Sequence, residues 1–278
     1  MLLLKRVNSF SAFIVILSLS QPFFSYSERG ERDTSELIIA SASDLQFAME
    51  DLIKAFEDRY PDVKIKVSYG SSGNFFSQIK NGAPFHIFFS ADMIYPERLA
   101  NEGYSEGGAQ PLMYGMGKVV IWVQRGSPID VEGLKFESLL HPSVKKIAIA
   151  NPDHAPYGRA AKESLVRSGI FEKVKDKLVM GENISQAAQF VQSGAADIGI
   201  IALSIAMSSE MRENGKYWEI PEEHHNPLRQ GFILLNNPPL NKGGTGGVRL
   251  ARLFADFVKG ADGISILRKY GFIVTSNQ

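Results

Sequence analysis

The sequence predicts an α/β protein with largely parallel sheets. From Glu36 onward, strand-like segments alternate with helix-like segments of about 8 to 16 residues, and most of the latter end at a glycine. With 278 residues, 44% of them hydrophobic, the chain is long enough to form two modest lobes around buried cores.

The first elements follow the periodicities of strands and helices. Residues 36–42, ELIIASA, predict a strand, and residues 44–60 place apolar side chains from Leu45 to Phe56 at helical spacing. Residues 63–69 alternate with a period of two, as a strand does. The further predicted strands are 86–91, 118–124, 145–151, 177–182, 196–203 and 230–236, and the further predicted helices are 74–82, 93–103, 158–169, 184–194, 248–260 and 263–271.

One stretch predicts a surface loop. Residues 236–247, NNPPLNKGGTGG, are rich in Asn, Pro and Gly and precede the last helices. The Gly-Gly-Thr-Gly-Gly part resembles a phosphate-binding loop in composition only, because the Lys-Ser/Thr ending and a preceding strand are missing.

The N-terminus predicts export. Lys5 and Arg6 precede an apolar run of about 10 residues, and small residues follow at Ser25 and Ser27, which is the layout of a signal peptide over residues 1–27. The run is shorter than the roughly 20 residues that span a bilayer.

Composition narrows the functional classes. Thirty Lys and Arg balance thirty Asp and Glu, which argues against a nucleic-acid-binding protein. The chain has no cysteine, so it has no disulfides, thiolate metal sites or cysteine nucleophiles. None of the five histidines is in His-Glu-x-x-His spacing and Gly-x-Ser-x-Gly is absent, so we do not expect an enzyme. The Glu-Glu-His-His run at 222–225 predicts a solvated surface segment rather than a metal site.

Four strand-to-helix junctions share the same chemistry: residues 40–44, 70–73, 151–158 and 181–185. Ligands of open α/β sheets bind at the carboxyl ends of the strands, where the first turns of helices present unpaired N–H groups. One interpretation is that the junctions converge on a small anion.

In that case Ser43 and Ser72 would donate O–H bonds, and Tyr157 and Ile184 would donate backbone N–H bonds. The other interpretation is that Ser43, Ser72 and Asn183 only cap their helices.

Five segments, ASDLQFAMEDL, GSSGNFFSQIKNGAPFHIFFSAD, NPDHAPYGRAAKESL, GENISQAAQFVQSGAADIGIIALS and LRKYGF, together resemble the molybdate-binding proteins (ModA family) of bacterial ABC importers. The resemblance runs in order from about residue 37 to 274. It implies a type II periplasmic-binding-protein fold, in which two α/β lobes joined by a two-segment hinge close on one oxyanion. Lobe one would comprise residues 36–113 plus 233–278, and lobe two residues 117–229.

The resemblance also implies the ligand and the partner. The ligand would be molybdate or tungstate, held by Ser43, Ser72, Tyr157 and Ile184, without a cofactor and without direct contact to the metal. A periplasmic monomer would deliver it to an inner-membrane ABC permease. The alternatives are another anion, namely sulfate, phosphate or a small organic anion, or less plausibly a hydrolytic enzyme.

Three positions depart from the family's pattern. Some members place a tyrosine hydroxyl on the anion where Ala202 stands here, so that donor is either missing or supplied by Ser204. His86 replaces an Asp of the family, which leaves its partner open. The first junction is one residue longer than in some members, which makes Ser41 or Asp44 conceivable substitutes for Ser43, although a carboxylate would repel an oxyanion unless it is turned away.

Overall fold

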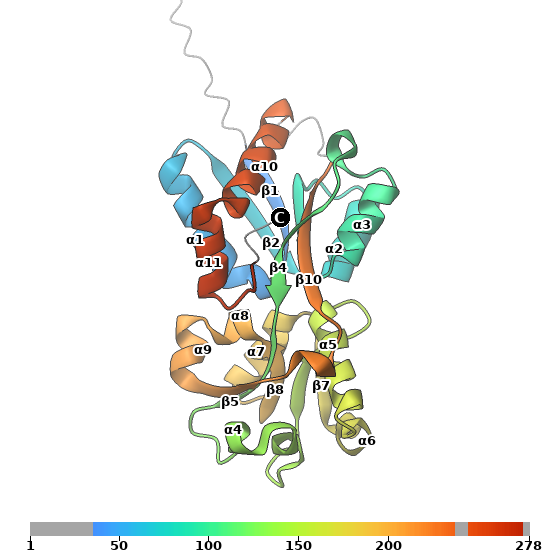
Figure 1. The fold of residues 1–278 in the computed structure, drawn as a ribbon, viewed down its shortest axis with the longest axis vertical. Coiled ribbons are helices and arrows are strands. Elements are labelled where there is room, and N and C mark those ends of the chain that lie inside the picture. Colours follow the sequence, from blue (N-terminus) through green and yellow to red (C-terminus); the bar gives the residue numbers. More distant parts are fainter. Residues whose placement is uncertain (1–35, 237–243, 275–278) are drawn as a thin grey trace, which may run out of the picture. The chain divides into compact units, whose positions relative to one another are not determined.

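The computed structural model describes residues 36–236 and 244–274, which form two five-stranded mixed sheets (Figure 1). The signal peptide expected over residues 1–27 lies outside the described residues. Within the described part of the chain, no helix combines the length and the apolar character needed to cross a membrane.

The first sheet has the strand order β2-β1-β3-β10-β4. Strand β1 pairs in parallel with β2 and β3, whereas β10 is antiparallel to both β3 and β4. Its strands are β1 (Glu36–Ala42), β2 (Lys64–Gly70), β3 (Ile87–Ser90), β4 (Leu112–Gly117) and β10 (Leu228–Leu234).

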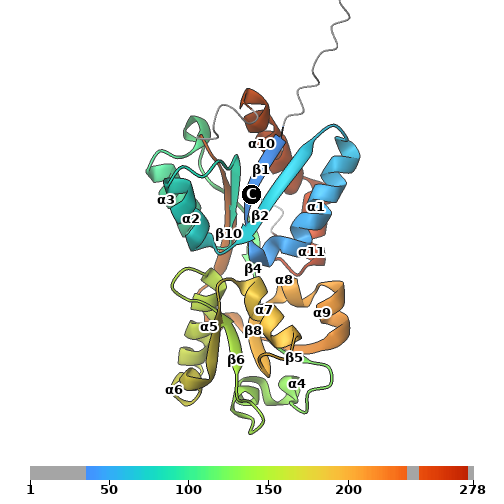
Figure 2. The ribbon, with the colours of Figure 1, turned by 180° about the vertical axis from the view of Figure 1, so that it is seen from behind.

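Helices cover both faces of this sheet (Figure 2). Helices α1 (Gln46–Arg59), α10 (Gly244–Lys259) and α11 (Ala261–Lys269) lie on one face, and α2 (Ser72–Lys80) and α3 (Ile94–Asn101) on the other. The period of two along β1 explains the arrangement: Leu37 and Ile39 pack in the core with Phe254 of α10, whereas Ala40 packs with Phe75 of α2. We call this sheet with its helices the first lobe.

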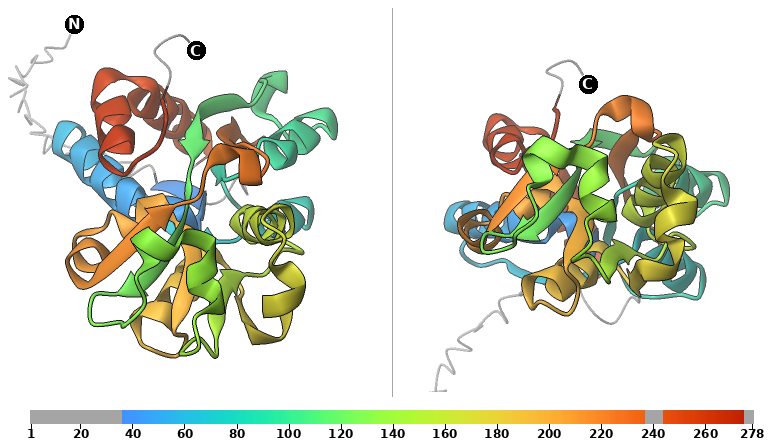
Figure 3. Two further views of the ribbon diagram at one scale, coloured as in Figure 1. Left: turned by 60° about the horizontal axis from the view of Figure 1, so that its bottom comes forward. Right: turned by 90° about the horizontal axis from the view of Figure 1, so that it is seen from below.

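The second sheet has the order β7-β6-β8-β5-β9 and also lies between helices (Figure 3). Its strands are β5 (Val119–Gln124), β6 (Ile147–Ala150), β7 (Leu178–Gly181), β8 (Ile198–Ala202) and β9 (Gly215–Glu219), and its helices are α4 (Val131–Leu134), α5 (Pro156–Arg167), α6 (Phe171–Val174), α7 (Ile184–Gln192), α8 (Leu203–Ala206) and α9 (Ser209–Asn214). We call this sheet with its helices the second lobe. The 3-10 helices of the two lobes are η1 (Ser43–Leu45), η2 (Glu106–Gly108), η3 (Lys135–Leu140), η4 (Lys175–Lys177) and η5 (Glu222–His224).

The two sheets share one topology, although the sequence has no repeat of fixed period. In each, a central strand (β1 or β6) pairs in parallel with two neighbours, and one strand (β10 or β5) runs against the others. The chain leaves the first sheet after Gly117 and enters the second at Val119, and it returns between Glu219 and Leu228. The prediction of a two-lobed α/β fold is confirmed.

Two sequence predictions about secondary structure are wrong. Strands β4 and β9 were not expected, because glycines interrupt LMYGMG and β9 is short and only partly buried. The predicted loop over 236–247 includes the first turn of α10, since residues 244–247 are helical there. Tertiary packing overrides the low helix propensity of glycine: a Cβ on Gly247 would lie 2.2 Å from His86 Nε2. Residues 237–243 lie outside the described residues.

His86 has a structural partner in the first lobe. Its Nδ1 accepts a hydrogen bond of 2.9 Å from the backbone N–H of Ile38, and the backbone N–H of His86 donates to the Ile38 carbonyl oxygen. Burial lowers the pKa of this imidazole, which favours the neutral ring that such a bond requires.

Candidate functional site

A small cavity between the lobes is lined by residues from all four of the predicted junctions. The space that protein atoms leave unfilled there is about 180 Å³, including the part that is open to solvent. Its lining consists of Ala42, Ser43, Asp44, Gly70, Ser71, Ser72, Ala91, Ala155, Pro156, Tyr157 and Ile184. The structure therefore brings together Ser43 and Ser72 of the first lobe with Tyr157 and Ile184 of the second.

The two serines are buried and able to donate a hydrogen bond. Ser43 is 2% exposed, and its Oγ has no hydrogen-bond partner. Ser72 is fully buried, and its Oγ accepts a bond of 3.0 Å from the N–H of Ala91, which leaves its own hydrogen available. Buried hydroxyls normally have their bonds satisfied, so an orphaned Oγ at a cavity wall indicates a missing partner.

Helix capping is done by other residues. Ser71, not Ser72, caps α2 by accepting from the N–H of Asn74, and Asn183 caps α7 by accepting from the N–H of Gln186. No side-chain cap bond is made at the start of η1, where Ser43 stands. The capping interpretation therefore holds for Asn183 and not for Ser43 or Ser72.

Tyr157 and Ile184 lie in the first turns of α5 and α7. Pro156 is the first residue of α5 and has no N–H to satisfy, so Tyr157 is the first donor of that helix. Ile184 is the first residue of α7. The first N–H groups of a helix have no intrahelical acceptor, and the helix dipole adds positive potential at this end.

Direct contacts between the lobes surround the cavity. The N–H of Gly73 donates to the carbonyl oxygen of His154 at 2.9 Å, and Ser71 Oγ lies 2.9 Å from His154 Nδ1. On another side, Ser185 Oγ donates to the carbonyl oxygen of Ser43 at 3.0 Å. The lobes therefore meet closely around the cavity, and its walls are buried.

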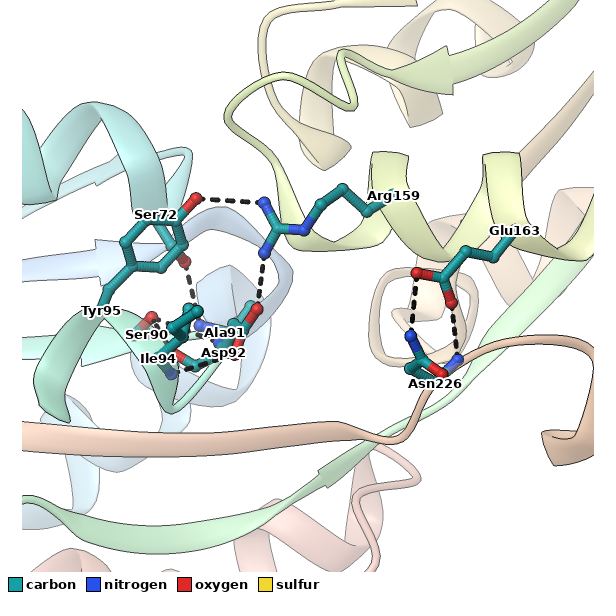
Figure 4. Close-up of polar contacts among 9 residues, drawn as sticks. All are labelled: Ser72, Ser90, Ala91, Asp92, Ile94, Tyr95, Arg159, Glu163 and Asn226. Carbon is teal, nitrogen blue, oxygen red and sulfur yellow. Dashed lines mark hydrogen bonds and ion pairs between the residues drawn. The ribbon is translucent and has the colours of Figure 1, made fainter. Parts of the chain in front are cut away.

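A salt bridge joins the lobes outside the cavity. Arg159 of α5 reaches Asp92, with 2.5 Å between Nη2 and Oδ2, and donates to Tyr95 Oη at 3.0 Å (Figure 4). Arg159 is not among the residues that line the cavity, and no Lys, Arg or His belongs to that lining. Any anion in the cavity would thus be bound by dipoles and hydroxyls rather than by a cation.

A buried polar cluster adjoins the cavity. Gln230 of β10 donates from Nε2 to Asp44 Oδ2 at 2.8 Å and to Tyr157 Oη at 3.0 Å, and Tyr114 Oη donates to Gln230 Oε1 at 2.5 Å. Asp44 is 1% exposed, and its Oδ1 has no hydrogen-bond partner.

Burial dominates the titration of this cluster. It raises the pKa of Asp44 to about 6, although hydrogen bonds from Gln230, Tyr157 and nearby backbone amides act in the opposite direction. Burial, and then the charge of Asp44, also raises the pKa of Tyr114 and Tyr157 well above the ordinary value. Both phenols are therefore neutral hydrogen-bond donors at physiological pH.

Comparisons with known proteins show the family of this chain. A model of the bacterial extracellular solute-binding protein family matches residues 37–273. The molybdate-binding protein ModA of Azotobacter vinelandii is 34% identical over 238 residues, which cover 86% of this chain and 90% of that protein. The chain belongs to this family of solute-binding proteins, which includes ModA.

Two further matches support the assignment. ModA of Rhodobacter capsulatus is 34% identical over 209 residues, 75% of this chain and 77% of that protein. The structure of the periplasmic molybdate-binding protein of A. vinelandii superimposes with a TM-score of 0.77 at 29% identity, covering 86% of this chain and 99% of that one. The family expected from the five sequence segments is confirmed.

Where some members of the family have a tyrosine, this chain has Ala202. Ala202 is buried and directly precedes α8. Ser204, expected as a substitute donor, is not among the residues lining the cavity: its Oγ donates to the backbone carbonyl oxygen of Asp44 at 2.7 Å. In this arrangement Ser204 positions Asp44, and its hydroxyl hydrogen is already used.

The Glu-Glu-His-His run is less exposed than the sequence predicted. His225 is 4% exposed and its Nδ1 lies 2.9 Å from the carbonyl oxygen of Asn226, while the ring of His224 packs edge-on against Phe136. Among the described residues, no group of three or more His, Asp or Glu is arranged to hold a metal ion.

The raised pKa of Asp44 predicts a pH-dependent stability. Its pKa is about 6 in the folded state, above the ordinary value of 3.8, so between these values the folded protein binds more protons than the unfolded chain and becomes less stable as pH rises. The loss amounts to about 3 kcal/mol above pH 6. Asp44→Asn should therefore be more stable than the native chain at pH 7.5 and lose this advantage near pH 4, as measured by urea unfolding without oxyanions.

Asp58→Asn, at the exposed end of α1, is the matched control and should show no such crossover. A less stable Asp44→Asn variant at pH 7.5 would contradict the assignment of a strained carboxylate at this position.

Proposed function

We propose that this protein binds molybdate, and tungstate in the same way, as the substrate-binding component of an ABC importer. The observation that carries the proposal is the cavity itself: donors from four helix starts, two on each lobe, line one buried space whose walls hold no cation. The relatives from A. vinelandii and R. capsulatus are named molybdate-binding proteins, which points to the same oxyanion here.

The donors suit a small tetrahedral oxyanion. Ser43 and Ser72 offer hydroxyl hydrogens, and the first turns of α5 and α7 offer the N–H groups of Tyr157 and Ile184. Hydrogen bonds to a charged partner contribute roughly 1.5–3 kcal/mol each, so a few of them support micromolar or tighter binding after the cost of association. The metal atom would be reached only through its oxygen atoms.

Binding would be accompanied by closure of the lobes. The hinge would lie at the two crossings near Lys118 and Arg229. The lobe bounds expected from the sequence, 36–113 plus 233–278 and 117–229, would then place the end of β4 and the start of β10 at this hinge. The bonds from Gly73 to His154 and from Arg159 to Asp92 join the lobes in the closed arrangement and would break on opening.

The location of the protein and its partner follow from the family. Residues 1–27 would direct export and be removed, and the mature monomer would act in the periplasm. Its partner would be an inner-membrane ABC permease that accepts the closed, loaded form. No cofactor and no catalytic step are part of this function.

Ligand-dependent unfolding tests the proposal directly. The mature protein should be heated with molybdate, tungstate, sulfate, phosphate or citrate at equal concentrations. A ligand present at 100 times its Kd adds about 2.7 kcal/mol of stability, which raises the midpoint by several degrees. We expect a shift with molybdate and tungstate and little with the other anions. A shift with sulfate alone would assign a different cargo, and no shift with any oxyanion would refute the proposal.

Ser43→Ala should weaken molybdate binding by about 1.5–3 kcal/mol, because its otherwise unpartnered hydroxyl would donate to a charged ligand. Ser41→Ala is the control: Ser41 lies on the same segment, outside the cavity lining, and its Oγ donates to the Ala42 carbonyl oxygen. Calorimetric titration with molybdate measures the affinity of both variants. Equal affinities of Ser43→Ala and the native protein would remove Ser43 from the site.

Gly73→Ala should hinder closure. A Cβ at this position would lie 2.8 Å from the carbonyl oxygen of His154 and 3.0 Å from its Cα, and neither atom can move without the second lobe. We expect molybdate affinity to fall by about 1–3 kcal/mol, the usual cost of overpacking. Gly126→Ala, where a Cβ would meet no atom within 4 Å, is the control. Unchanged affinity in Gly73→Ala would argue against closure at this contact.

A further inference from the structure

Asp44 is a carboxyl group at the wall of a cavity built to receive an anion. It is 1% exposed, and it stands between the unpartnered Ser43 and the first turn of α1. An ionised carboxylate here would face a dianion inside a buried space, where like charges repel more strongly than in water.

The two oxygens of the carboxyl group are in different situations. Oδ2 accepts from Gln230 Nε2 at 2.8 Å, and Tyr157 is a second hydrogen-bond partner of the same side chain. Oδ1 has no hydrogen-bond partner. Oδ1 is therefore the oxygen on which a proton could be held and donated into the cavity.

Among the described residues, no positively charged group neighbours Asp44. The side chains that contact or perturb it are Gln230 of β10, Tyr157 of α5 and Tyr114 of β4, with Ser204 of α8 bonded to its backbone carbonyl. All four are uncharged, and the hydrogen bonds from Gln230, Tyr157 and the backbone N–H groups of Asp44 and Leu45 offset only part of the cost of burying a charge. Arg159, the cation closest in sequence to the α5 junction, is engaged by Asp92 and Tyr95. A proton is therefore the simplest means of removing the charge.

We propose that Asp44 binds the oxyanion as a neutral carboxylic acid that donates the hydrogen on Oδ1, so that each binding event takes up one proton from solvent. The inference rests on the proposed function, because it concerns the same cavity. The balance is simple: the ionised protein, one proton and the oxyanion dianion give the complex, with no other reactant. In the closed arrangement, burial already brings the pKa of Asp44 to about 6 without an anion in the cavity.

Two readouts test the proposal on the native, mature protein. At pH 7.5, the apparent enthalpy of molybdate binding should be measured by calorimetry in Tris and in imidazole. The two values should differ by nearly the full difference between the ionisation enthalpies of the two buffers, because about one proton is taken up per anion. Between about pH 6.5 and 8.5, where molybdate stays a dianion, the Kd should rise about tenfold per pH unit as the free carboxyl group ionises.

Asp44→Asn supplies an uncharged side chain with an N–H donor at every pH. Its Kd should be nearly independent of pH, its proton uptake should vanish, and it should bind more tightly than the native chain at pH 8.5. Asp58→Asn, which removes an exposed carboxylate on the following helix α1, should keep the native slope and proton uptake.

The outcomes separate this inference from the proposed function. Binding of molybdate by the native protein with a flat pH profile and no proton uptake would overturn the role of Asp44 and leave the function standing. A native pH slope retained in Asp44→Asn would assign the proton to another group and also overturn it. If Asp44→Asn fails to fold, the buffer dependence of the native protein still decides the question. Absence of molybdate binding at every pH would instead refute the proposed function.

Discussion

The hydrogen bonds of Gln230 are the interaction on which the geometry of the site depends. This residue is fully buried on β10, and its amide nitrogen joins Asp44 of the first lobe to Tyr157 of the second. Tyr114 occupies the amide oxygen and so fixes which way the amide group faces. A buried amide with all its bonds made costs little, whereas one that loses them carries a full desolvation penalty. The starts of η1 and α5 are thereby held in one relative position, and the donors of the cavity with them.

Binding an anion without a cation has a consequence for selectivity. A lysine or arginine could follow ligands of different sizes, because its long side chain moves. The donors that we propose are backbone N–H groups at helix starts and short, buried serine hydroxyls, which are held in place by the packing of two lobes. Gly73 permits the close approach, since a side chain there would strike the backbone at His154. A site of this kind discriminates by the distance between its donors, so the size and the bond lengths of the oxyanion should decide its affinity more than its charge.

Much of this arrangement could be predicted from local sequence signals. The alternation of strands and helices indicates where helix N-termini gather, and the serine and glycine residues at those junctions identify Ser43 and Ser72 as donors that the structure does bring together. The polar cluster could not be predicted, because its members are far apart in sequence: Asp44 and Gln230 are separated by 186 positions. Nothing in the residues around Gln230 distinguishes it from an ordinary strand residue. The helical turn at 244–247 was missed for a similar reason, since it depends on contact with His86 rather than on its own propensity.

In the proposed mechanism, Asp44 would also connect closure of the lobes with release of the anion. If the lobes separate, water would reach the carboxyl group, and its pKa would fall back toward the ordinary value of 3.8. At neutral pH the proton would then leave, and the hydrogen-bond donor would become a negative charge beside the anion. The same side chain would therefore favour binding in the closed arrangement and oppose it in the open one. An asparagine would donate in both arrangements and would provide no such difference. The carboxyl group thus offers a physical reason for a binding protein to hold its anion when closed and yield it when opened, without any cation at the site.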